Sequence, residues 1–197
     1  MQADSNAVIA DIRAAQKGDE RAFERLLDMV EKPVYRLALS ITRRREDAED
    51  ATQEALIKLW RALPGYRFEC PLLPYALQIA RNAALDIARR EAATRQNTVS
   101  LSQESEHGEE VTMEVADTDE FADPARAYER KETIEAVRRG ISELPDEYRE
   151  ILTLKDIEGL SYEQIGRVLT LEQGTVKSRL SRARKKLLEI LKRRNIF

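Results

Sequence analysis

An acidic stretch without regular spacing of apolar residues divides the chain in two, and it limits the possible folds more than any other feature. Residues 94–124 contain one basic residue, Arg95, against nine acidic ones. Such a segment cannot bury enough apolar surface to offset the conformational entropy lost on ordering. We therefore predict a flexible acidic linker between two small domains, residues 1–93 and 125–197. The alternative is an ordinary surface loop, which the length of the segment disfavours.

Both flanking parts have apolar residues at three- and four-residue spacing, the period of an amphipathic helix. Ala, Glu, Leu, Lys and Arg make up over half of the chain, and only seven glycines and six prolines are left for turns. This composition favours an all-α protein over a β-sandwich or a parallel α/β domain. We expect helices at about 7–16, 46–63, 75–93, 125–142 and 174–191. Three further helices should begin after N-caps at Asp19, Asp146 and Ser161. The first of these three should bend at Pro33, and the second should end at Gly159.

Residues that hold metals or form disulfides are scarce. Cys70 and His107 are the only cysteine and histidine, so we expect no disulfide framework, no metal site and no cofactor. An enzyme is disfavoured because the sequence has no glycine-rich phosphate loop and no histidine-based dyad. The N-terminus lacks a signal-peptide pattern, and no run approaches the ~18 apolar residues of a membrane span. We expect a soluble, cytoplasmic protein that does not insert into a membrane.

Charge is distributed unevenly, although the net charge is only −3. Residues 1–93 hold 15 basic and 15 acidic side chains, residues 94–160 hold 8 and 18, and residues 161–197 hold 10 and 3. A basic end of this kind indicates a nucleic-acid partner. Many helical proteins have basic C-terminal faces, so the charge alone does not decide.

The last predicted helix combines a narrow apolar stripe with basic flanks. Val176, Leu180 and Ala183 share one face with Leu187, while residues 173–188 contain no acid. A helix whose charges only keep it soluble would carry acids among the bases. With the preceding helix and turn, the pattern predicts a helix-turn-helix unit that binds duplex DNA. We define its duplex-reading face as Thr175, Lys177, Ser178, Arg179, Ser181, Arg182, Arg184 and Lys185. The candidates for base contacts are Lys177, Ser178 and Arg182.

Two segments resemble regions of one protein family. Residues 144–187, LPDEYREILTLKDIEGLSYEQIGRVLTLEQGTVKSRLSRARKKL, resemble region four of the extracytoplasmic-function (ECF) sigma factors of the sigma-70 family, which recruit bacterial RNA polymerase to promoters. Residues 22–63, AFERLLDMVEKPVYRLALSITRRREDAEDATQEALIKLWRAL, and residues 75–90, YALQIARNAALDIARR, resemble region two. The resemblance implies two helical domains that bind core polymerase and recognise the minus-ten and minus-thirty-five promoter elements without catalysis of their own. A stand-alone helix-turn-helix regulator is the alternative, but it leaves the first domain unexplained.

The resemblance also implies partners and a role for the linker. The partners are the clamp helices of the largest catalytic polymerase subunit, the flap of the second-largest subunit, promoter DNA and an anti-sigma factor. The linker is expected to thread toward the active centre of the polymerase, where acidic side chains would mimic phosphate charge. The linker acids of this hypothesis are Glu104, Glu106, Glu109, Glu110, Asp117, Asp119 and Glu120.

The helix at 46–63 should turn a polar surface outward, with Ile57 as an isolated apolar residue in it. A single exposed apolar side chain is common on protein surfaces, so the pattern alone fits an ordinary surface. By the resemblance, this helix docks on the clamp helices, and its mixture of carboxylates, an amide and one apolar group suits that contact. We define the docking face as Asp47, Asp50, Gln53, Glu54, Ile57 and Arg61.

By the same resemblance, the loop at 65–74 and the helix after it bind the melted nontemplate strand of the minus-ten element. Single-stranded bases need aromatic stacking surfaces and basic groups beside the backbone. Core packing is the alternative for the aromatic residues of this part of the chain, more so for Trp60 and Tyr75 than for Tyr66 and Phe68. We define the strand-binding face as Tyr66, Arg67, Phe68, Tyr75, Gln78, Arg81, Asn82 and Arg89.

The sequence departs from the family pattern in two turns. The loop has Phe68, Cys70 and Tyr75 where the family has glycine, serine and tryptophan, and Pro71 and Pro74 stiffen it. This bears on base preference, and it leaves Cys70 as either a redox-sensitive thiol or, more simply, a small substitute for serine. In region four, a glycine at position 166 replaces alanine, and Thr170-Leu171 replaces a turn that contains glycine. We expect these changes to alter the turn but to keep the fold.

Overall fold

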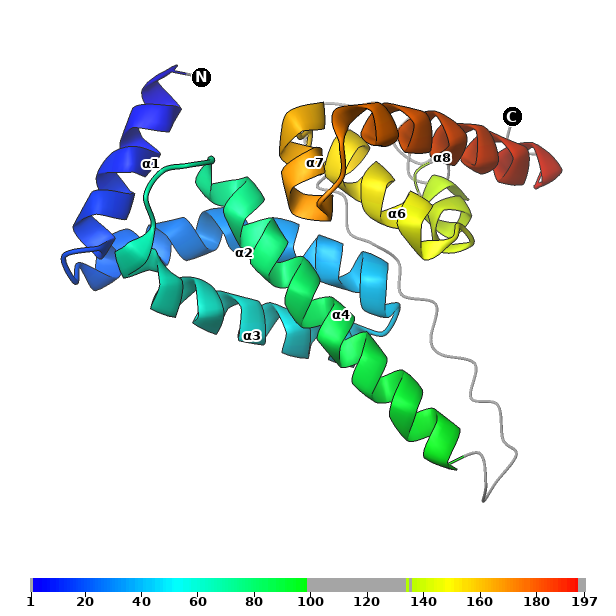
Figure 1. The fold of residues 1–197 in the computed structure, drawn as a ribbon, viewed down its shortest axis with the longest axis horizontal. Coiled ribbons are helices and arrows are strands. Elements are labelled where there is room, and N and C mark those ends of the chain that lie inside the picture. Colours follow the sequence, from blue (N-terminus) through cyan, green and yellow to red (C-terminus); the bar gives the residue numbers. More distant parts are fainter. Residues whose placement is uncertain (1, 99–133, 135, 195–197) are drawn as a thin grey trace, which may run out of the picture.

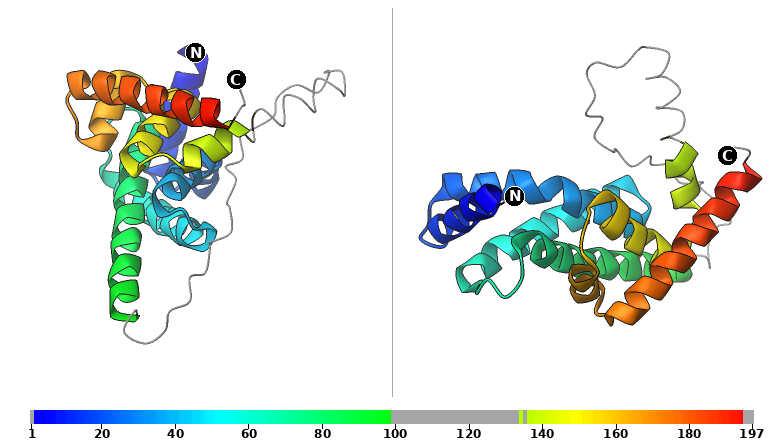
Figure 2. Two further views of the ribbon diagram at one scale, coloured as in Figure 1. Left: turned by 90° about the vertical axis from the view of Figure 1, so that its right-hand side faces the viewer. Right: turned by 90° about the horizontal axis from the view of Figure 1, so that it is seen from above.

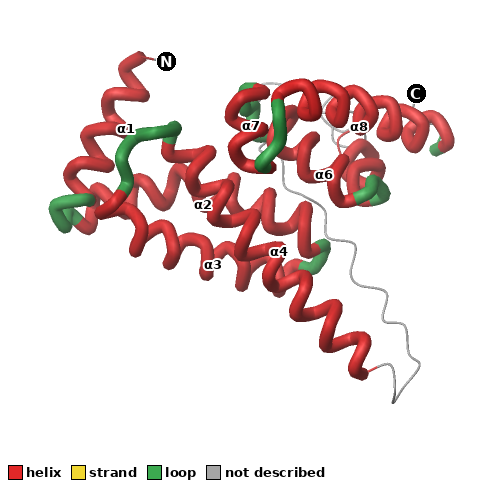
Figure 3. The backbone as a smooth tube through the Cα atoms, in the orientation of Figure 1, coloured by secondary structure: helices red, strands yellow, loops and turns green. Residues whose placement is uncertain are grey.

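The computed structural model describes residues 2–98, 134 and 136–194, and this part of the chain consists of helices and short loops without a strand (Figures 1 and 3). The all-α prediction is therefore confirmed. The residues of the acidic linker from 99 onward, with all seven acids of the phosphate-mimic hypothesis, lie outside the described residues.

The part predicted to be the first domain, which we continue to call the first domain, contains four helices. They are α1 (Gln2–Ala15), α2 (Glu20–Thr42), α3 (Arg45–Ala62) and α4 (Leu72–Thr98), with a 3₁₀ turn, η1 (Leu63–Gly65), after α3. The Asp19 carboxylate caps α2 by accepting a hydrogen bond from the Ala22 amide at 3.1 Å, as predicted. Pro33 lies inside α2 without ending it.

Helix α4 is longer than predicted at both ends. It begins at Leu72, directly after Pro71, and it continues to Thr98, so residues 94–98, the start of the predicted linker, are helical. Pro74 lies in the first turn, where no intrahelical hydrogen bond needs its missing amide hydrogen. The end of α4 extends away from the other helices, as Figure 1 shows. Among the described residues it has nothing to pack against there, which agrees with the lack of an apolar stripe in its last turns.

The second domain contains helical residues 136–142, α6 (Asp146–Leu152), the π-helical turn η2 (Thr153–Ile157), α7 (Tyr162–Leu169) and α8 (Gln173–Arg193). Ser161 caps α7 as predicted, and together with Gln164 it forms a reciprocal capping box. Gly159 ends the preceding helix with φ +69°, also as expected. The predicted cap at Asp146 is wrong: Pro145 occupies the cap position, and the Asp146 carboxylate binds Arg43 and Arg149 instead.

The two domains pack against each other. Helices α6 and α7 lie against α2 and α4 in all views (Figures 1 and 2), and the buried apolar side chains of both domains form one continuous cluster. Leu37 and Leu77 of the first domain and Ile151 and Ile165 of the second belong to this cluster, each fully buried. The first half of α4 is thus covered by the second domain.

Candidate nucleic-acid interface

Helix α8 presents the duplex-reading face to solvent. Its apolar stripe is buried as predicted at Val176, Leu180 and Ala183, while Leu187 is half-buried. Seven of the eight members of the face are exposed, and Arg179 is half-buried. An exposed row of cations and hydroxyl groups on a straight helix matches the shape of a DNA major groove.

Carboxylates of the same domain hold two of these cations. Arg184 forms a bidentate pair with Asp156, which raises the pKa of the guanidinium, and Arg179 pairs with Glu147 at 3.4 Å. Arg182 and Lys185 are exposed and make no ion pair with a described residue. Lys177 is also exposed and makes no ion pair with a described residue, with its Nζ 5.9 Å from the Tyr162 ring centroid. Lys177, Arg182 and Lys185 are therefore the cations of this face most available to an incoming phosphate or base.

The turn between α7 and α8 depends on one glycine. Thr170 adopts a left-handed backbone with φ +56°, and the Leu171 amide donates to the Gly166 carbonyl at 2.8 Å. This brings the Leu171 carbonyl oxygen so close that a Cβ at position 166 would lie 2.6 Å from it. The tight turn formed by Thr170-Leu171 requires that a side chain be absent at 166. The two differences from the family pattern in this region therefore depend on each other.

The loop before α4 is built around three aromatic rings, and it corrects the prediction for Tyr66. The Tyr66 ring is buried, 8% exposed, and its hydroxyl donates a short hydrogen bond to the Cys70 carbonyl. Burial raises the pKa of Tyr66 to about 12. It packs against Phe68 and Tyr75 with centroid distances of 5.1 and 5.2 Å. Tyr66 is thus a core residue of the loop, because its ring is buried against the two other rings and its hydroxyl is bonded to the loop backbone.

Phe68 takes the exposed position in this loop. It is 40% exposed and has a left-handed backbone, φ +59°, which is uncommon for an aromatic residue. The Arg13 guanidinium lies 5.9 Å from its ring centroid, and Arg67 beside it is exposed. An exposed ring next to cations provides the stacking surface and the charge that single-stranded bases require. Tyr75 is half-buried against the core.

Sequence reasoning missed the residue that fixes this loop to the first helices. Gln16, which follows α1, donates from Nε2 to the carbonyl oxygens of Leu63 at 3.0 Å and Tyr66 at 2.9 Å. These contacts join residues about fifty positions apart, so no local pattern reveals them. Gln16 therefore positions the strand-binding loop without belonging to it.

On α4, the members of the strand-binding face differ in their exposure to solvent. Asn82 and Arg89 are exposed, with Arg89 3.4 Å from Asp86, and Gln78 is half-buried. Arg81, also a member of this face, is half-buried and pairs with Glu150 of the second domain at 3.1 Å. Burial raises the pKa of the Glu150 carboxyl, and Arg81 acts against that shift.

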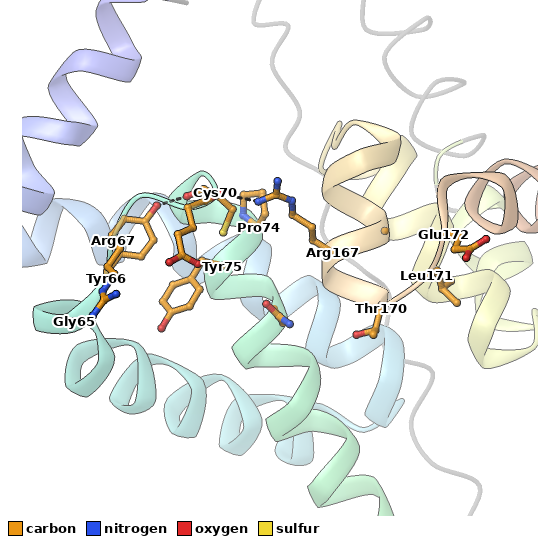
Figure 4. A pocket seen from close by; sticks show the side chains of 13 residues that line it. Gly65, Tyr66, Arg67, Cys70, Pro74, Tyr75, Arg167, Thr170, Leu171 and Glu172 are labelled. Carbon is orange, nitrogen blue, oxygen red and sulfur yellow. Dashed lines mark hydrogen bonds between the residues drawn. The ribbon is translucent and has the colours of Figure 1, made fainter.

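A cleft of about 790 Å³ lies between this loop and the turn before α8 (Figure 4). Tyr75, Gln78 and Arg67 line one wall, and Thr170 and Arg167 line the other. Arg167 bridges the two walls by donating to the Glu69 carbonyl at 2.7 Å. Segments predicted to bind two different promoter elements therefore meet at one cleft.

The docking face forms an exposed row along α3. Asp50, Gln53, Ile57 and Arg61 are exposed, Ile57 by 44%, and Asp47 and Glu54 are half-buried. Lys58 binds the Glu54 carboxylate at 2.7 Å and lowers its pKa. Trp60 is also 43% exposed, one turn from Ile57, with its ring edge-on to Phe23 at 4.3 Å. The apolar part of this face is thus larger than predicted, since Trp60 was considered only beside the strand-binding loop.

The described residues contain no group of three side chains that could hold a metal ion. None of the helices they form combines the length and apolar character needed to cross a bilayer.

Two family models match the chain, one for each predicted domain. The model for Sigma-70 region 2 matches residues 26–94, and the model for Sigma-70, region 4 matches residues 134–187. Among similar proteins, the RNA polymerase sigma-H factor of Pseudomonas aeruginosa is 32% identical over 175 residues, 88% of each chain. The ECF RNA polymerase sigma factor SigM of Mycobacterium tuberculosis is 32% identical over 183 residues, 92% of this chain and 84% of the relative.

Two solved structures have a similar fold. The sigma factor RpoE from Bartonella quintana, in complex with the anti-sigma factor NepR, superposes with a TM-score of 0.65 at 25% identity, covering 86% of this chain and 96% of that one. CnrH, in complex with the cytosolic domain of CnrY, superposes with a TM-score of 0.64 at 22% identity, covering 94% and 97%. At that identity the CnrH likeness concerns the fold alone.

Proposed function

The chain belongs to the ECF group of the sigma-70 family, and from this premise we propose how its surfaces direct RNA polymerase to promoters. As a sigma factor it binds core RNA polymerase and confers promoter-specific initiation; polymerisation itself belongs to the core enzyme. We assign residues 1–93 to docking and minus-ten recognition and residues 125–197 to minus-thirty-five recognition. The site of action is the cytoplasm, where RNA polymerase works.

One observation carries this assignment: two separate surfaces suited to nucleic acid lie on two domains, together with a third surface suited to a protein. The exposed cations of α8 fit duplex DNA, whereas Phe68 with Arg67 fits unstacked bases. The docking face on α3, with Ile57 and Trp60 exposed among carboxylates, fits the clamp helices of the polymerase. A regulator that binds an operator alone needs only the first of these surfaces.

We assign further partners by the family relationship. Region four contacts the flap of the second-largest polymerase subunit, which holds it at the distance of the minus-thirty-five element. An anti-sigma protein binds the free chain and keeps it from polymerase. Tethering two weak DNA-binding modules raises the effective concentration of one when the other is bound, so promoter recognition needs both domains.

The test is reconstitution of the full chain with bacterial core polymerase, followed by initiation from genomic DNA fragments. We expect core-dependent transcripts from a defined set of promoters. A footprint by the chain alone, without transcripts, would instead identify an operator-binding regulator. The double variant Glu54→Ala with Ile57→Ser should weaken core binding about tenfold or more while leaving promoter preference unchanged. The control Glu24→Ala alters an exposed acid of α2 outside the docking face; equal core binding by both variants would refute the docking assignment.

A further inference from the structure

Phe68, in the loop before α4, combines an exposed aromatic ring with a strained backbone. Its φ of +59° lies in the left-handed region, which glycine adopts readily and a residue with a Cβ rarely does. The ring is 40% exposed, so the fold gains little apolar burial in return for this strain. Strained residues of this kind are concentrated at sites that bind ligands. The ring therefore calls for a function outside the core.

The Phe68 ring is supported from inside the loop by Tyr66. The two ring centroids are 5.1 Å apart and the ring planes are tilted by 58°. Tyr66 is itself buried, and its hydroxyl donates to the Cys70 carbonyl. Phe68 thus has a fixed neighbour beneath it while part of its ring faces solvent. A flat apolar surface held in one place is what an unstacked base needs for stacking.

A cation from the first helix lies beside this ring. The guanidinium of Arg13, in the last turn of α1, is 5.9 Å from the Phe68 ring centroid. Arg13 is exposed and makes no ion pair with a described residue, whereas Arg25 nearby is bound to Asp11 by two of its nitrogens. An exposed cation–π contact is weak, and a phosphate offers a guanidinium two charged acceptors. Arg13 is therefore free to exchange the ring for a phosphate.

Helix α1 and the loop are fixed to each other, so Arg13 and Phe68 stay close. Ile12, directly before Arg13, is only 2% exposed and anchors α1 in the core. Gln16 donates to the carbonyl oxygens of Leu63 and Tyr66, on both sides of the turn that leads into the loop. The region 2 model begins to match at residue 26, after α1. The pairing of Arg13 with Phe68 is thus a feature that this chain builds outside the matched segment.

We propose that Arg13 and Phe68 form a subsite for one nucleotide of the melted nontemplate strand. An unstacked base stacks on Phe68, and Arg13 binds the phosphate beside that base. A phenyl ring has no hydrogen-bonding group and every nucleotide carries a phosphate, so the subsite accepts any base. It adds affinity for the open strand, while other members of the strand-binding face select the sequence. The inference rests on the proposed function for the origin of the strand.

The experiment uses variants of the full chain, assembled with core polymerase, and a labelled nontemplate-strand oligonucleotide. Phe68→Gly and Phe68→Asn remove the ring, and both new residues tolerate a positive φ. Each should therefore unfold at a urea concentration equal to or above that of the unsubstituted protein, and using two variants guards against a defect of one. Arg13→Gln removes the charge and keeps donors. Its control is Arg21→Gln, which changes an exposed cation of α2 outside all three faces.

We expect both Phe68 variants to bind the oligonucleotide about tenfold more weakly, because one stacking contact is lost. Arg13→Gln should bind about threefold more weakly, and the slope of log K against log salt concentration should fall by about 0.7. Arg21→Gln should change neither quantity. These results would place a ring contact and a phosphate contact on the same strand.

Two scans of the oligonucleotide then locate the contacts. Removing one base at a time should find a position that matters to the unsubstituted protein but not to the Phe68 variants. Replacing one phosphate at a time by a neutral methylphosphonate should find a position that matters to the unsubstituted protein but not to Arg13→Gln. The two positions should belong to the same or adjacent nucleotides. Exchanging the base there among all four should alter binding by less than about threefold.

Three results would overturn the subsite. They are a base scan that is unchanged in the Phe68 variants, equal losses in Arg13→Gln and Arg21→Gln, and a preference above about tenfold for one base at the located position. Failure of the proposed function looks different. A holoenzyme that binds single strands without preferring the minus-ten sequence, and that does not initiate, would refute that function, while the two scans would still decide whether Arg13 and Phe68 hold a nucleotide.

Discussion

The two DNA-binding surfaces of this protein are built in different ways. The duplex-reading face lies on one helix, α8, whose side chains are placed by the helical period and the capped helix before it. The strand-binding face is assembled from a loop and α4, is fixed by Gln16 from the N-terminal part and is partly covered by the second domain. A surface on one rigid helix tolerates change around it, whereas a surface held by distant contacts is sensitive to residues that never touch DNA.

The strongest test of this contrast asks whether the duplex-reading face depends on a residue outside α8, and Gly166 of α7 is a candidate. Gly166→Ala places a Cβ 2.6 Å from the Leu171 carbonyl oxygen, which belongs to the backbone and cannot rotate away. We expect a loss of about 1–3 kcal/mol in the free energy of unfolding of region four and loss of minus-thirty-five recognition. Hydrogen exchange of α7 and α8 and holoenzyme promoter binding measure the two effects.

Gly174→Ala is the matched control, since a Cβ at that position meets no atom within 4 Å. It lies in the first turn of α8, where alanine should leave stability unchanged or slightly raise it. Equal behaviour of the two variants would show that the turn can relax and that α8 alone defines the face.

The next test concerns the availability of side chains within α8. Arg182 is exposed and unpaired among the described residues, so Arg182→Ala should reduce discrimination between the cognate and altered minus-thirty-five sequences about tenfold. Lys186→Ala removes a cation outside the duplex-reading face that already lies 3.5 Å from Glu189. This variant should weaken binding to all minus-thirty-five sequences slightly and equally. Equal loss of discrimination in both variants would assign Arg182 to phosphate contact.

A smaller effect is expected from Gln16, and it tests the distant support of the strand-binding face. Gln16→Met keeps the shape of the side chain but removes the donors to the Leu63 and Tyr66 carbonyls. Since each hydrogen bond contributes about 1 kcal/mol, binding of a nontemplate-strand oligonucleotide by the holoenzyme should weaken about three- to tenfold. Minus-thirty-five discrimination should stay the same. Lys17→Ala, at the exposed neighbour, is the control; a uniform loss at both elements would indicate a general fold defect.

The same contrast explains which features could be predicted from the sequence. The N-cap at Ser161 and the buried stripe from Val176 to Ala183 follow from short-range patterns, and both are confirmed. The exposed row of α3 also follows from its period. The burial of Tyr66 and the engagement of Arg81 by Glu150 depend on residues far along the chain, so no periodicity reveals them.

The interdomain contact was beyond prediction for a further physical reason. Charged residues such as Arg149 and Glu158 are usually solvated, so their presence in a sequence favours a surface position. Only their geometry shows that carbonyl and carboxylate groups replace the water around Arg149 and that the Arg36 guanidinium replaces it at Glu158. The end of α4 is a similar case. Residues 94–98 have no apolar stripe, so the sequence indicated a linker, but α4 continues through them to Thr98.

The smallest expected effect tests whether Tyr66 is a core residue of the strand-binding loop rather than a stacking surface. Tyr66→Phe removes the hydroxyl that donates to the Cys70 carbonyl, so it should cost about 1 kcal/mol of folding stability near pH 8. The folded-state pKa of about 12 lies above the ordinary value of 10, so the native chain retains this proton while the unfolded chain loses it. The protein with Tyr66 therefore loses folding stability as pH rises from about 10 to 12, whereas the Tyr66→Phe variant has no hydroxyl to titrate and lacks this loss.

The difference in free energy of unfolding between the unsubstituted protein and the variant should accordingly narrow above pH 10. All other titrating groups are shared, so their effects cancel in this difference. Urea unfolding at pH 8 and pH 10.5 measures it. A gap that stays constant would mean that the hydroxyl is already in contact with water, and the ring would then be close enough to the surface to stack on a base. In that case the strand-binding face would contain two exposed rings, Tyr66 and Phe68, and would depend less on distant contacts than the structure indicates.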